Sequence, residues 1–219
     1  MRNRLVFGAL VLDESEGGKG DEERVASLLR EAALSRGPRA FCEEDELDRL
    51  FARVELVREQ CGRTEVTALT EDDARTALAE LCSGRRSFSE LREADLIESL
   101  HARLSGAARA LLSSLAPESV DLPRRRSVRV RYERGKPPWI ASRLQDFFGM
   151  TSGPTVGGGR IPLVLHLLAP NQRAVQVTTD LAGFWKRSYP AIRKELSRKY
   201  PKHAWPEDPV SVRAPVARK

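Results

Sequence analysis

The spacing of apolar residues changes within residues 116–127, "APESVDLPRRRS", and this change constrains the fold more than any other feature. Before it, apolar residues recur every three or four positions, which is the spacing of a helix face. After it, apolar and polar residues alternate, as in a strand with one buried face. Because the two periods occupy separate segments, the sequence predicts an α+β fold, with helices first and a mixed layer after them.

The first 118 residues are predicted to form one strand and a small helical bundle. Residues 1–20 contain "RLVFGALVL", which reads as a single strand buried on both faces, followed by a flexible polar turn. Residues 21–118 have helical spacing and short connections. Within them, Thr70 precedes three acidic residues and predicts a helix start, and Ser87 or Ser89 predicts another.

Residues 119–209 are predicted to form a β-α-β-β-α module. "SVRVRY" reads as a half-buried strand, and "PPWIASRLQDFFG" as a helix with Ile140 and Leu144 on one face. "IPLVLHLL" and "AVQVTT" read as two strands joined by a tight turn. The last segment is helical, with a break expected at Ser188 and Tyr189, because Pro190 disfavours helix at Tyr189 and Ser188 can cap a new helix. Residues 210–219 are expected to form a flexible tail.

Charge is distributed unevenly along the chain. Residues 1–121 have a balance of −8 and residues 122–219 a balance of +14, which together give the net charge of +6. A strongly basic segment suits a polyanion such as nucleic acid. We therefore expect RNA or another single-stranded nucleic acid as partner. The candidate contacts are Arg124, Arg125, Arg126, Arg129, Arg131, Lys186, Arg187, Lys194, Arg198, Lys199 and Lys202.

Aromatic residues are interleaved with these cations in "FWKRSYPAIRKELSRKY". Tyr189 and Leu196 lie on one stripe of the predicted helix, and Lys194 lies roughly opposite. The rings are therefore expected to pack inward, which argues against stacking of bases on Tyr189 or Tyr200. The outward cations leave two alternatives open, a phosphate-binding surface and a solvated face without a ligand.

No sequence motif supports catalysis, a cofactor or a metal site. "GGKG" at residues 17–20 lacks the serine or threonine that a phosphate-binding Walker loop needs after its lysine. The three cysteines are far apart and are expected to be reduced thiols. His101 and His203 are isolated, and His166 in an apolar strand is expected to be a hydrogen-bonded structural residue. We expect no enzyme activity from this chain alone.

No apolar run reaches the roughly 18–20 residues that span a bilayer. The N-terminal apolar run continues into Asp13 without a cleavage site of small residues, so a strand is expected there in place of a signal peptide. The expected location is the cytoplasm. Nothing in the sequence indicates an oligomeric state.

Several longer pieces of the sequence carry a family resemblance. They are "LQDFFG" at 144–149, "PLVLHLL" at 162–168, "TTDLAGFW" at 178–185, and "RKEL" at 193–196 with the ending "RKYPKHAWPEDP". The segment 122–209 that contains them resembles the C-terminal region of the bacterial DEAH-box ATP-dependent helicase HrpB family. The N-terminal strand also resembles the strand that follows this family's oligonucleotide-binding barrel.

The resemblance implies that the chain corresponds to the tail of a helicase, a fragment or truncated product whose residues 1–20 are the remnant of a preceding β domain. The helicase motor domains would be partners in cis. ATP and magnesium are implied only for the full-length helicase, because its ATP-binding and DEAH motifs have no counterpart here. Two functions stay open: a non-catalytic accessory part that positions nucleic acid or regulates the motor, and a protein-interaction or structural module docking on the helicase core or another protein.

Overall fold

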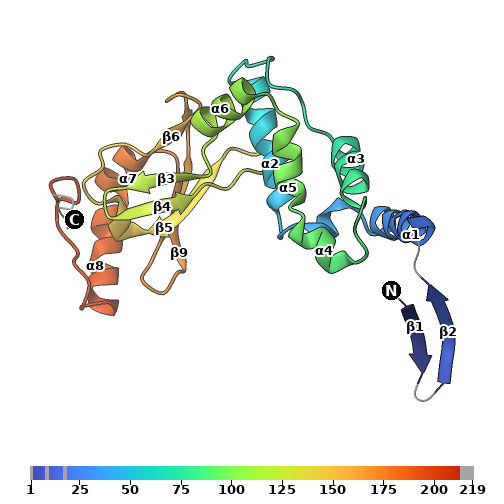
Figure 1. The fold of residues 1–219 in the computed structure, drawn as a ribbon. Helices are drawn as coiled ribbons and strands as arrows, with labels where there is room; N and C mark the ends of the chain where they lie inside the picture. Colours follow the sequence, from blue (N-terminus) through green and yellow to red (C-terminus); the bar gives the residue numbers. More distant parts are fainter. Residues whose placement is uncertain (1, 8–9, 17–18, 213–219) are drawn as a thin grey trace, which may run out of the picture. The chain divides into compact units, whose positions relative to one another are not determined.

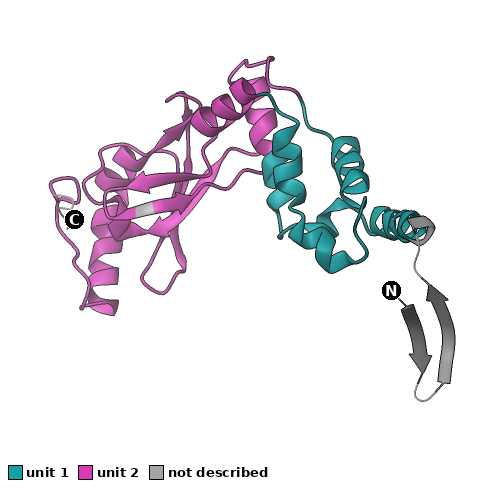
Figure 2. Cartoon of the chain, in the orientation of Figure 1, with its two compact units in different colours: residues 1–51, 68–105 teal, residues 52–67, 106–219 magenta. Residues whose placement is uncertain are grey.

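The computed structural model describes the backbone of residues 2–7, 10–16 and 19–212, and the side chains of residues 22–212 except Arg126. The chain divides into two compact units that interleave in sequence (Figure 2). The N-terminal unit comprises residues 1–51 and 68–105, and the C-terminal unit comprises residues 52–67 and 106–219. The predicted ranges 1–20, 21–118, 119–209 and 210–219 divide the sequence differently and stay a prediction of domain organisation.

The N-terminal unit opens with two strands where the sequence analysis predicted one. β1 (Arg2–Phe7) pairs antiparallel with β2 (Leu10–Glu16), and the polar segment after β2 leads at once into α1 (Lys19–Arg36) (Figure 1). The prediction of a single strand was wrong because a hairpin and one long buried strand have the same apolar composition, and periodicity alone does not distinguish them. The polar turn predicted after it was also too long, since β2 extends to Glu16.

Short helices make up the rest of the N-terminal unit. They are the 3-10 helix η1 (Pro38–Phe41), the start of α2 (Glu46–Glu55), α3 (Glu71–Leu81), α4 (Phe88–Glu93) and α5 (Leu96–Ala102). Their apolar stripes form a core that includes Phe41, Leu47, Leu78 and Leu100. The small helical bundle predicted from helical spacing is therefore confirmed.

Side-chain hydrogen bonds fix the starts of these helices as the sequence indicated. The hydroxyl of Thr70 accepts a hydrogen bond from the amide of Asp73 (3.2 Å), and the Asp73 carboxylate accepts one from the Thr70 amide (2.8 Å). This reciprocal capping box lowers the pKa of Asp73, mainly through the side-chain hydrogen bond to Thr70. Ser87 caps α4 in the same way, accepting from the amide of Glu90.

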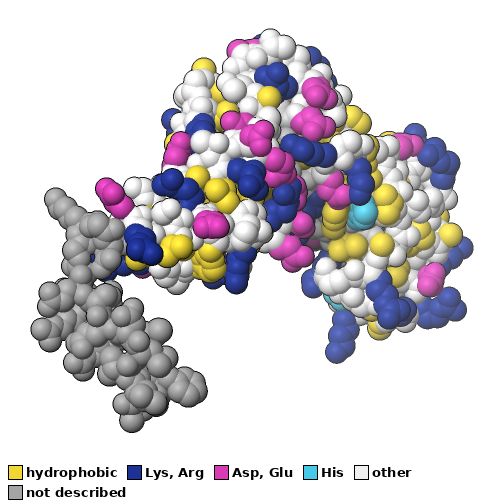
Figure 3. All heavy atoms as spheres, turned by 90° about the vertical axis from the view of Figure 1, so that its right-hand side faces the viewer, with side chains coloured by type: hydrophobic (Ala, Val, Ile, Leu, Met, Phe, Trp, Pro, Cys, Tyr) yellow, Lys and Arg dark blue, Asp and Glu magenta, His cyan; other side chains and the backbone are white. Residues whose placement is uncertain are grey.

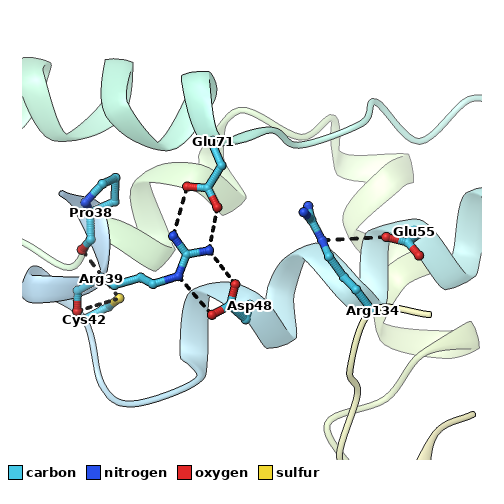
Figure 4. Close-up of polar contacts among 7 residues, drawn as sticks. All are labelled: Pro38, Arg39, Cys42, Asp48, Glu55, Glu71 and Arg134. Carbon is cyan, nitrogen blue, oxygen red and sulfur yellow. Dashed lines mark hydrogen bonds and ion pairs between the residues drawn. The ribbon is translucent and has the colours of Figure 1, made fainter. Parts of the chain in front are cut away.

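Arg39 of η1 joins three elements of this unit (Figure 4). Its guanidinium donates to both carboxylate oxygens of Asp48 on α2, at 3.0 and 2.6 Å, and to the carboxylate of Glu71 in the first turn of α3. These hydrogen bonds raise the pKa of Arg39 further above its ordinary value. The group is half-exposed, so we assign it a role in orienting helices and only a modest contribution to stability.

The C-terminal unit has mixed secondary structure. After the end of α2 it contains the π-helical turn η2 (Leu56–Gln60) and α6 (Gly106–Leu115). Two hairpins follow along the chain, β3 (Ser119–Leu122) with β4 (Arg125–Arg129), and β6 (Thr155–Val156) with β7 (Ile161–Pro162). The second strand of each hairpin overlaps a predicted strand, β4 with "SVRVRY" and β7 with the start of "IPLVLHLL", whereas β3 and β6 were not predicted.

A three-stranded sheet in the order β5-β8-β9 forms the centre of this unit. β5 (Trp139–Arg143) runs parallel to β8 (Val164–Leu168), and β9 (Ala174–Thr178) runs antiparallel to β8. The two strands predicted from "IPLVLHLL" and "AVQVTT" are thus confirmed. Arg131 and Trp139 exchange two backbone hydrogen bonds, at 2.8 and 3.0 Å, which join the end of β4 to β5.

The helix predicted after Pro137-Pro138 was wrong. Residues 139–143 form strand β5, and only Leu144–Phe147 adopt a single 3-10 turn, η3. Ile140 and Ser142 are buried while Ala141 and Arg143 are exposed, which is the alternation of a strand. Ile140, Leu144 and Phe147 are all buried, and their spacing imitated a helix stripe because the strand runs directly into the turn.

The chain ends in two short helices, α7 (Leu181–Arg187) and α8 (Tyr189–Lys199). The break between them falls at Ser188, where the sequence predicted it. At the class level, the predicted α+β fold is confirmed. The predicted tail at 210–219 lies largely outside the described residues.

Candidate nucleic-acid interface

The first turn of α7 is held by Asp180. Its carboxylate accepts a hydrogen bond from the amide of Gly183 (2.7 Å) and forms an ion pair with the guanidinium of Arg187 (2.8 Å). These two contacts, the amide first, lower the pKa of Asp180. A Cβ atom at position 183 would lie 1.9 Å from the Asp180 carboxylate, so glycine allows the carboxylate and the guanidinium to meet over the helix start. Arg187, one of the predicted contacts, therefore has a local partner.

Aromatic side chains fix the helices α7 and α8 to the rest of the unit. The Trp185 indole donates to the carbonyl of Met150 (2.9 Å), and the Tyr189 hydroxyl donates to the carbonyl of Pro206 (2.8 Å). The rings of both contact the ring of Phe148, and all three residues are buried. Burial raises the pKa of Tyr189 to about 12. The prediction that the rings pack inward is confirmed for Trp185 and Tyr189, whereas Tyr200 is only partly buried.

Five of the predicted cations lie on or beside these helices with exposed side chains. Lys194, Arg198 and Lys199 are on α8, Lys186 is on α7, and Lys202 follows α8. Within the part of the chain whose side chains are described, none of the five forms an ion pair with a carboxylate. Lys199 lies over the ring of Tyr200, with Nζ 5.8 Å from the ring centroid, and the exposed side chains of the other four extend to solvent.

Arg193 of α8 differs from these exposed cations, because it is already engaged within the protein. Arg193 is partly buried, donates to the carbonyl of Trp205 (2.9 Å) and pairs with Glu207 (3.1 Å). It therefore anchors the segment after α8 to the helix. On the face of the molecule drawn in Figure 3, Lys and Arg side chains are interspersed with Asp and Glu side chains, so this face has no continuous basic patch.

The predicted arginines of residues 124–131 belong to the first hairpin and the backbone after it. Arg125, Arg129 and Arg131 are exposed, and Arg129 and Arg131 alternate with the buried Val128 and Val130. Both point to the face of the strand away from the core. Arg124 is exposed and has interactions of its own, whereas the side chain of Arg126 lies outside the described residues.

Buried arginine contacts are the part of this unit that sequence reasoning missed. Arg53, at the end of α2, is 4% exposed, and its guanidinium donates to the carbonyl of Ala116 (2.8 Å) and to Glu118 (2.7 Å). Nearby in this unit, Arg134 pairs with Glu55 at 3.6 Å (Figure 4). No sequence signal distinguishes Arg53 from the exposed arginines, because its burial depends on contacts with residues more than sixty positions away.

Trp139 and His166 were also missed as a pair. Their rings lie 4.5 Å apart at an interplanar angle of 30°, and the Trp139 indole donates to Glu133 (2.8 Å). Within the described residues, the imidazole of His166 has no hydrogen-bond partner in the protein and is only partly buried, so the expectation of a hydrogen-bonded structural histidine stays a prediction. Its main contact is the ring of Trp139. The alternating pattern of residues 139–143 was the signal that could have placed the indole on an outer face.

Comparison with known proteins decides the family. A family model described as ATP-dependent helicase C-terminal matches residues 77–209. The chain belongs to this family. Consistent with that, the chain is 30% identical to the ATP-dependent RNA helicase HrpB of Escherichia coli (strain K12) over 219 residues, which is 98% of this chain and 27% of that protein. The resemblance to HrpB inferred from the sequence is confirmed.

Two solved structures of helicase family members have the same fold in this region. The crystal structure of the E. coli DExH-box NTPase HrpB matches with a TM-score of 0.77 at 30% identity, covering 100% of this chain and 27% of that one. The crystal structure of the E. coli DEAH/RHA helicase HrpB matches with a TM-score of 0.65 at 28% identity, covering 93% and 26%. The chain thus spans about a quarter of the length of the relatives it matches.

The described residues contain no group of three or more His, Cys, Asp or Glu side chains placed to hold a metal ion. None of the helices that the structure describes is both long and apolar enough to span a bilayer.

Proposed function

We propose that this chain is a non-catalytic accessory part of an ATP-dependent RNA helicase, and that it holds single-stranded RNA by its phosphates. The contacts are the exposed cations of α7, α8 and the residues after them, namely Lys186, Lys194, Arg198, Lys199 and Lys202. The observation that carries the proposal is the direction of these side chains. They are exposed and have no carboxylate partner in the described residues, while the ring of Tyr189 between them is buried and that of Tyr200 is partly exposed.

Anchoring of the helices supports a binding role over a merely solvated surface. Trp185, Tyr189 and Arg193 each donate a hydrogen bond to a backbone carbonyl, so the backbone that presents the cations is fixed before a ligand arrives. A fixed backbone reduces the conformational entropy lost on binding. The basic balance of +14 over residues 122–219 adds a longer-range attraction for a polyanion.

Phosphate binding of this kind is independent of base sequence and depends strongly on salt. For a single strand, the logarithm of the binding constant falls with the logarithm of salt concentration with a slope of about −0.7 for each phosphate neutralised. If the five cations each contact one phosphate, we expect a slope of roughly −3 to −4 for this chain.

The helicase chemistry itself is proposed to belong to the motor domains that relatives carry outside this region. ATP and magnesium would bind there, and this chain would act on RNA beside the motor or regulate it. We therefore expect ATP hydrolysis by this chain to stay at background, with or without RNA. A turnover that rises with RNA in a preparation without other ATPases would contradict a non-catalytic role. The cytoplasmic location expected from the sequence stays a prediction.

The test is a titration of the 219-residue chain with a fluorescent 12-nucleotide polyuridylate RNA at several salt concentrations. Lys194→Glu with Arg198→Glu should weaken binding and make the salt slope shallower by about 1.4, because two phosphate contacts are lost. The matched control is Arg24→Glu with Arg30→Glu, which reverses two exposed arginines on α1 and changes net charge equally. Equal losses in the two double variants would refute α8 as the contact and leave only a general charge effect.

A further inference from the structure

The sheet β5-β8-β9 has one face that the rest of the described C-terminal unit leaves accessible. Ile140, Leu165 and Leu167 are 0% exposed and form the core side. The positions that alternate with them are accessible to different extents, and Val177 on β9 is 48% exposed, an unusual value for a large apolar side chain in a strand. This second side is called the outer face here; its residues are Trp139, Ala141, Arg143, Val164, His166, Leu168 and Val177.

Strand pairing places the rings of the outer face in its middle. Ala141 of β5 pairs with His166 of β8, and His166 pairs in turn with Val177 of β9. The imidazole lies against the indole of Trp139, with ring centroids 4.5 Å apart. Both residues are partly exposed, and neither ring belongs to the aromatic cluster around Trp185. The two rings are stacked on each other, and because both side chains are partly exposed, part of the stacked pair is accessible on the outer face.

Cations border these rings on the same side of the strands. Arg131 is the direct backbone partner of Trp139, so its side chain leaves the sheet on the same face. Arg129 precedes it by two positions and Arg143 ends β5, and all three arginines are exposed. Among the strand positions that make up the outer face there is no Asp or Glu, although Glu133 lies next to the indole.

We propose that the outer face binds the bases of a single-stranded nucleic acid. A base would stack on the Trp139–His166 pair, and Arg129, Arg131 and Arg143 would neutralise the phosphates on either side. The inference rests on the proposed function and deepens it: the cations of α8 bind backbone only, whereas the outer face binds bases. Single-stranded binding proteins commonly combine aromatic stacking with a positively charged surface.

Charge decides between a nucleic acid and a protein as the occupant. An apolar protein interface would leave three arginines to be desolvated without carboxylates to receive them, which is costly. A phosphate chain instead supplies one negative charge per nucleotide at the positions that border the rings. Bases also fit a mixed surface of rings and small apolar side chains such as Ala141, because every base has a flat face.

The experiment compares two ligands with equal phosphates on the full 219-residue chain. One is a fluorescent 12-nucleotide polyuridylate RNA, and the other is the matching abasic 12-mer. We expect the RNA to bind about tenfold more tightly than the abasic chain, the order expected for one stacked base. Trp139→Leu should remove most of this difference, and Trp139→Phe, which keeps a ring, should preserve it. The tryptophan fluorescence of the unsubstituted chain should be quenched by RNA and less so by the abasic chain.

Further variants keep the test decisive if Trp139→Leu fails to fold. His166→Val removes the second ring and suits a strand, whereas His166→Tyr keeps a ring at that position. We expect the valine variant to lose part of the preference for RNA and the tyrosine variant to retain it. Thermal unfolding of each variant establishes that the sheet is intact.

Each outcome has one reading. Equal binding of RNA and abasic chain overturns the base-stacking inference and leaves phosphate binding by α8 intact. Absence of binding to either ligand overturns both proposals. A preference for RNA that survives Trp139→Leu and His166→Val also overturns the inference, since the bases must then be bound elsewhere. A protein whose capture depends on Trp139, together with equal binding of the two ligands, would assign the outer face to a protein partner.

Discussion

Replacing Arg53 by methionine should destabilise the C-terminal unit far more than removing its ionic partner. Arg53 has a side chain 5% exposed, whereas the side chain of Glu118 is 62% exposed. Methionine keeps most of the apolar stem but loses the donors to the carbonyl of Ala116 and to the carboxylate of Glu118. Because Arg53 is buried and Glu118 is exposed, replacing Arg53 should lower the free energy of unfolding more than replacing Glu118.

The magnitude follows from these environments. A hydrogen bond from a charged donor contributes about 1.5–3 kcal/mol, and a buried acceptor left without a donor costs about 1–3 kcal/mol. Allowing for some apolar burial by methionine, we expect Arg53→Met to lower the free energy of unfolding by about 3 kcal/mol. Glu118→Ala should cost about 1 kcal/mol or less, because water replaces an exposed carboxylate and Arg53 keeps its carbonyl partner.

Tryptophan fluorescence measures this effect in the right part of the molecule. All three tryptophans, at positions 139, 185 and 205, belong to the C-terminal unit. In a chain of this size, 3 kcal/mol corresponds to a fall of roughly 6–12 °C in the unfolding midpoint. If Glu118→Ala is as destabilising as Arg53→Met, the ion pair and not the carbonyl contact stabilises the unit. A loss under about 1 kcal/mol for Arg53→Met would refute the importance of either contact.

Three further predictions concern single side chains. Thr70→Ala should lower the free energy of unfolding of the N-terminal unit by about 1 kcal/mol, measured by circular dichroism. Because the fold lowers the pKa of Asp73, the stability that its carboxylate contributes is present above about pH 4 and is lost as the pH falls. Asp73→Asn should therefore make the acid dependence of stability flatter. Tyr189→Phe should lower the free energy of unfolding by about 1 kcal/mol at neutral pH. Because burial raises the pKa of Tyr189 to about 12 in the fold, the stability contributed by its neutral hydroxyl is complete below about pH 10 and is lost as the pH rises. In unfolding measurements at several pH values, the phenylalanine variant should therefore lose less stability above about pH 10. Gly157→Ala should be more destabilising than Gly159→Ala by about 1–2 kcal/mol in unfolding monitored by tryptophan fluorescence. Both glycines have positive φ, but only at position 157 would the new methyl group lie 2.8 Å from the Ile161 side chain. Equal losses of stability would show that backbone strain alone matters.

Prediction from the sequence succeeded where the signal is local. The caps at Thr70 and Ser87 and the break before Pro190 depend on residues a few positions apart, and the structure has each of them. The inward direction of Tyr189 also followed from helical spacing within one short segment. The caps and the break are fixed by neighbours along the chain, and the helical period decides which side of α8 carries Tyr189.

Prediction failed where the deciding contact is distant in sequence. Residues 139–143 form a strand because Trp139 pairs with Arg131 and β5 pairs with β8, about 25 residues further on. The apolar run at the N-terminus forms two strands because its halves pair with each other. The sequence identified the candidate lysines and arginines. Strand pairing was needed to show that some of them lie beside an accessible sheet face and not on an outward face of a helix.

The sequence by itself determined the α+β class, the caps that start several helices, the basic character of the C-terminal half and the family. Those properties depend on composition, local periodicity and motif, which are present in the unfolded chain. Only the tertiary structure decided that Arg53 is buried, that Trp139 and His166 meet, and which side of the sheet remains accessible. These properties arise when segments far apart in sequence exclude water together, and no local pattern records which segments will do so.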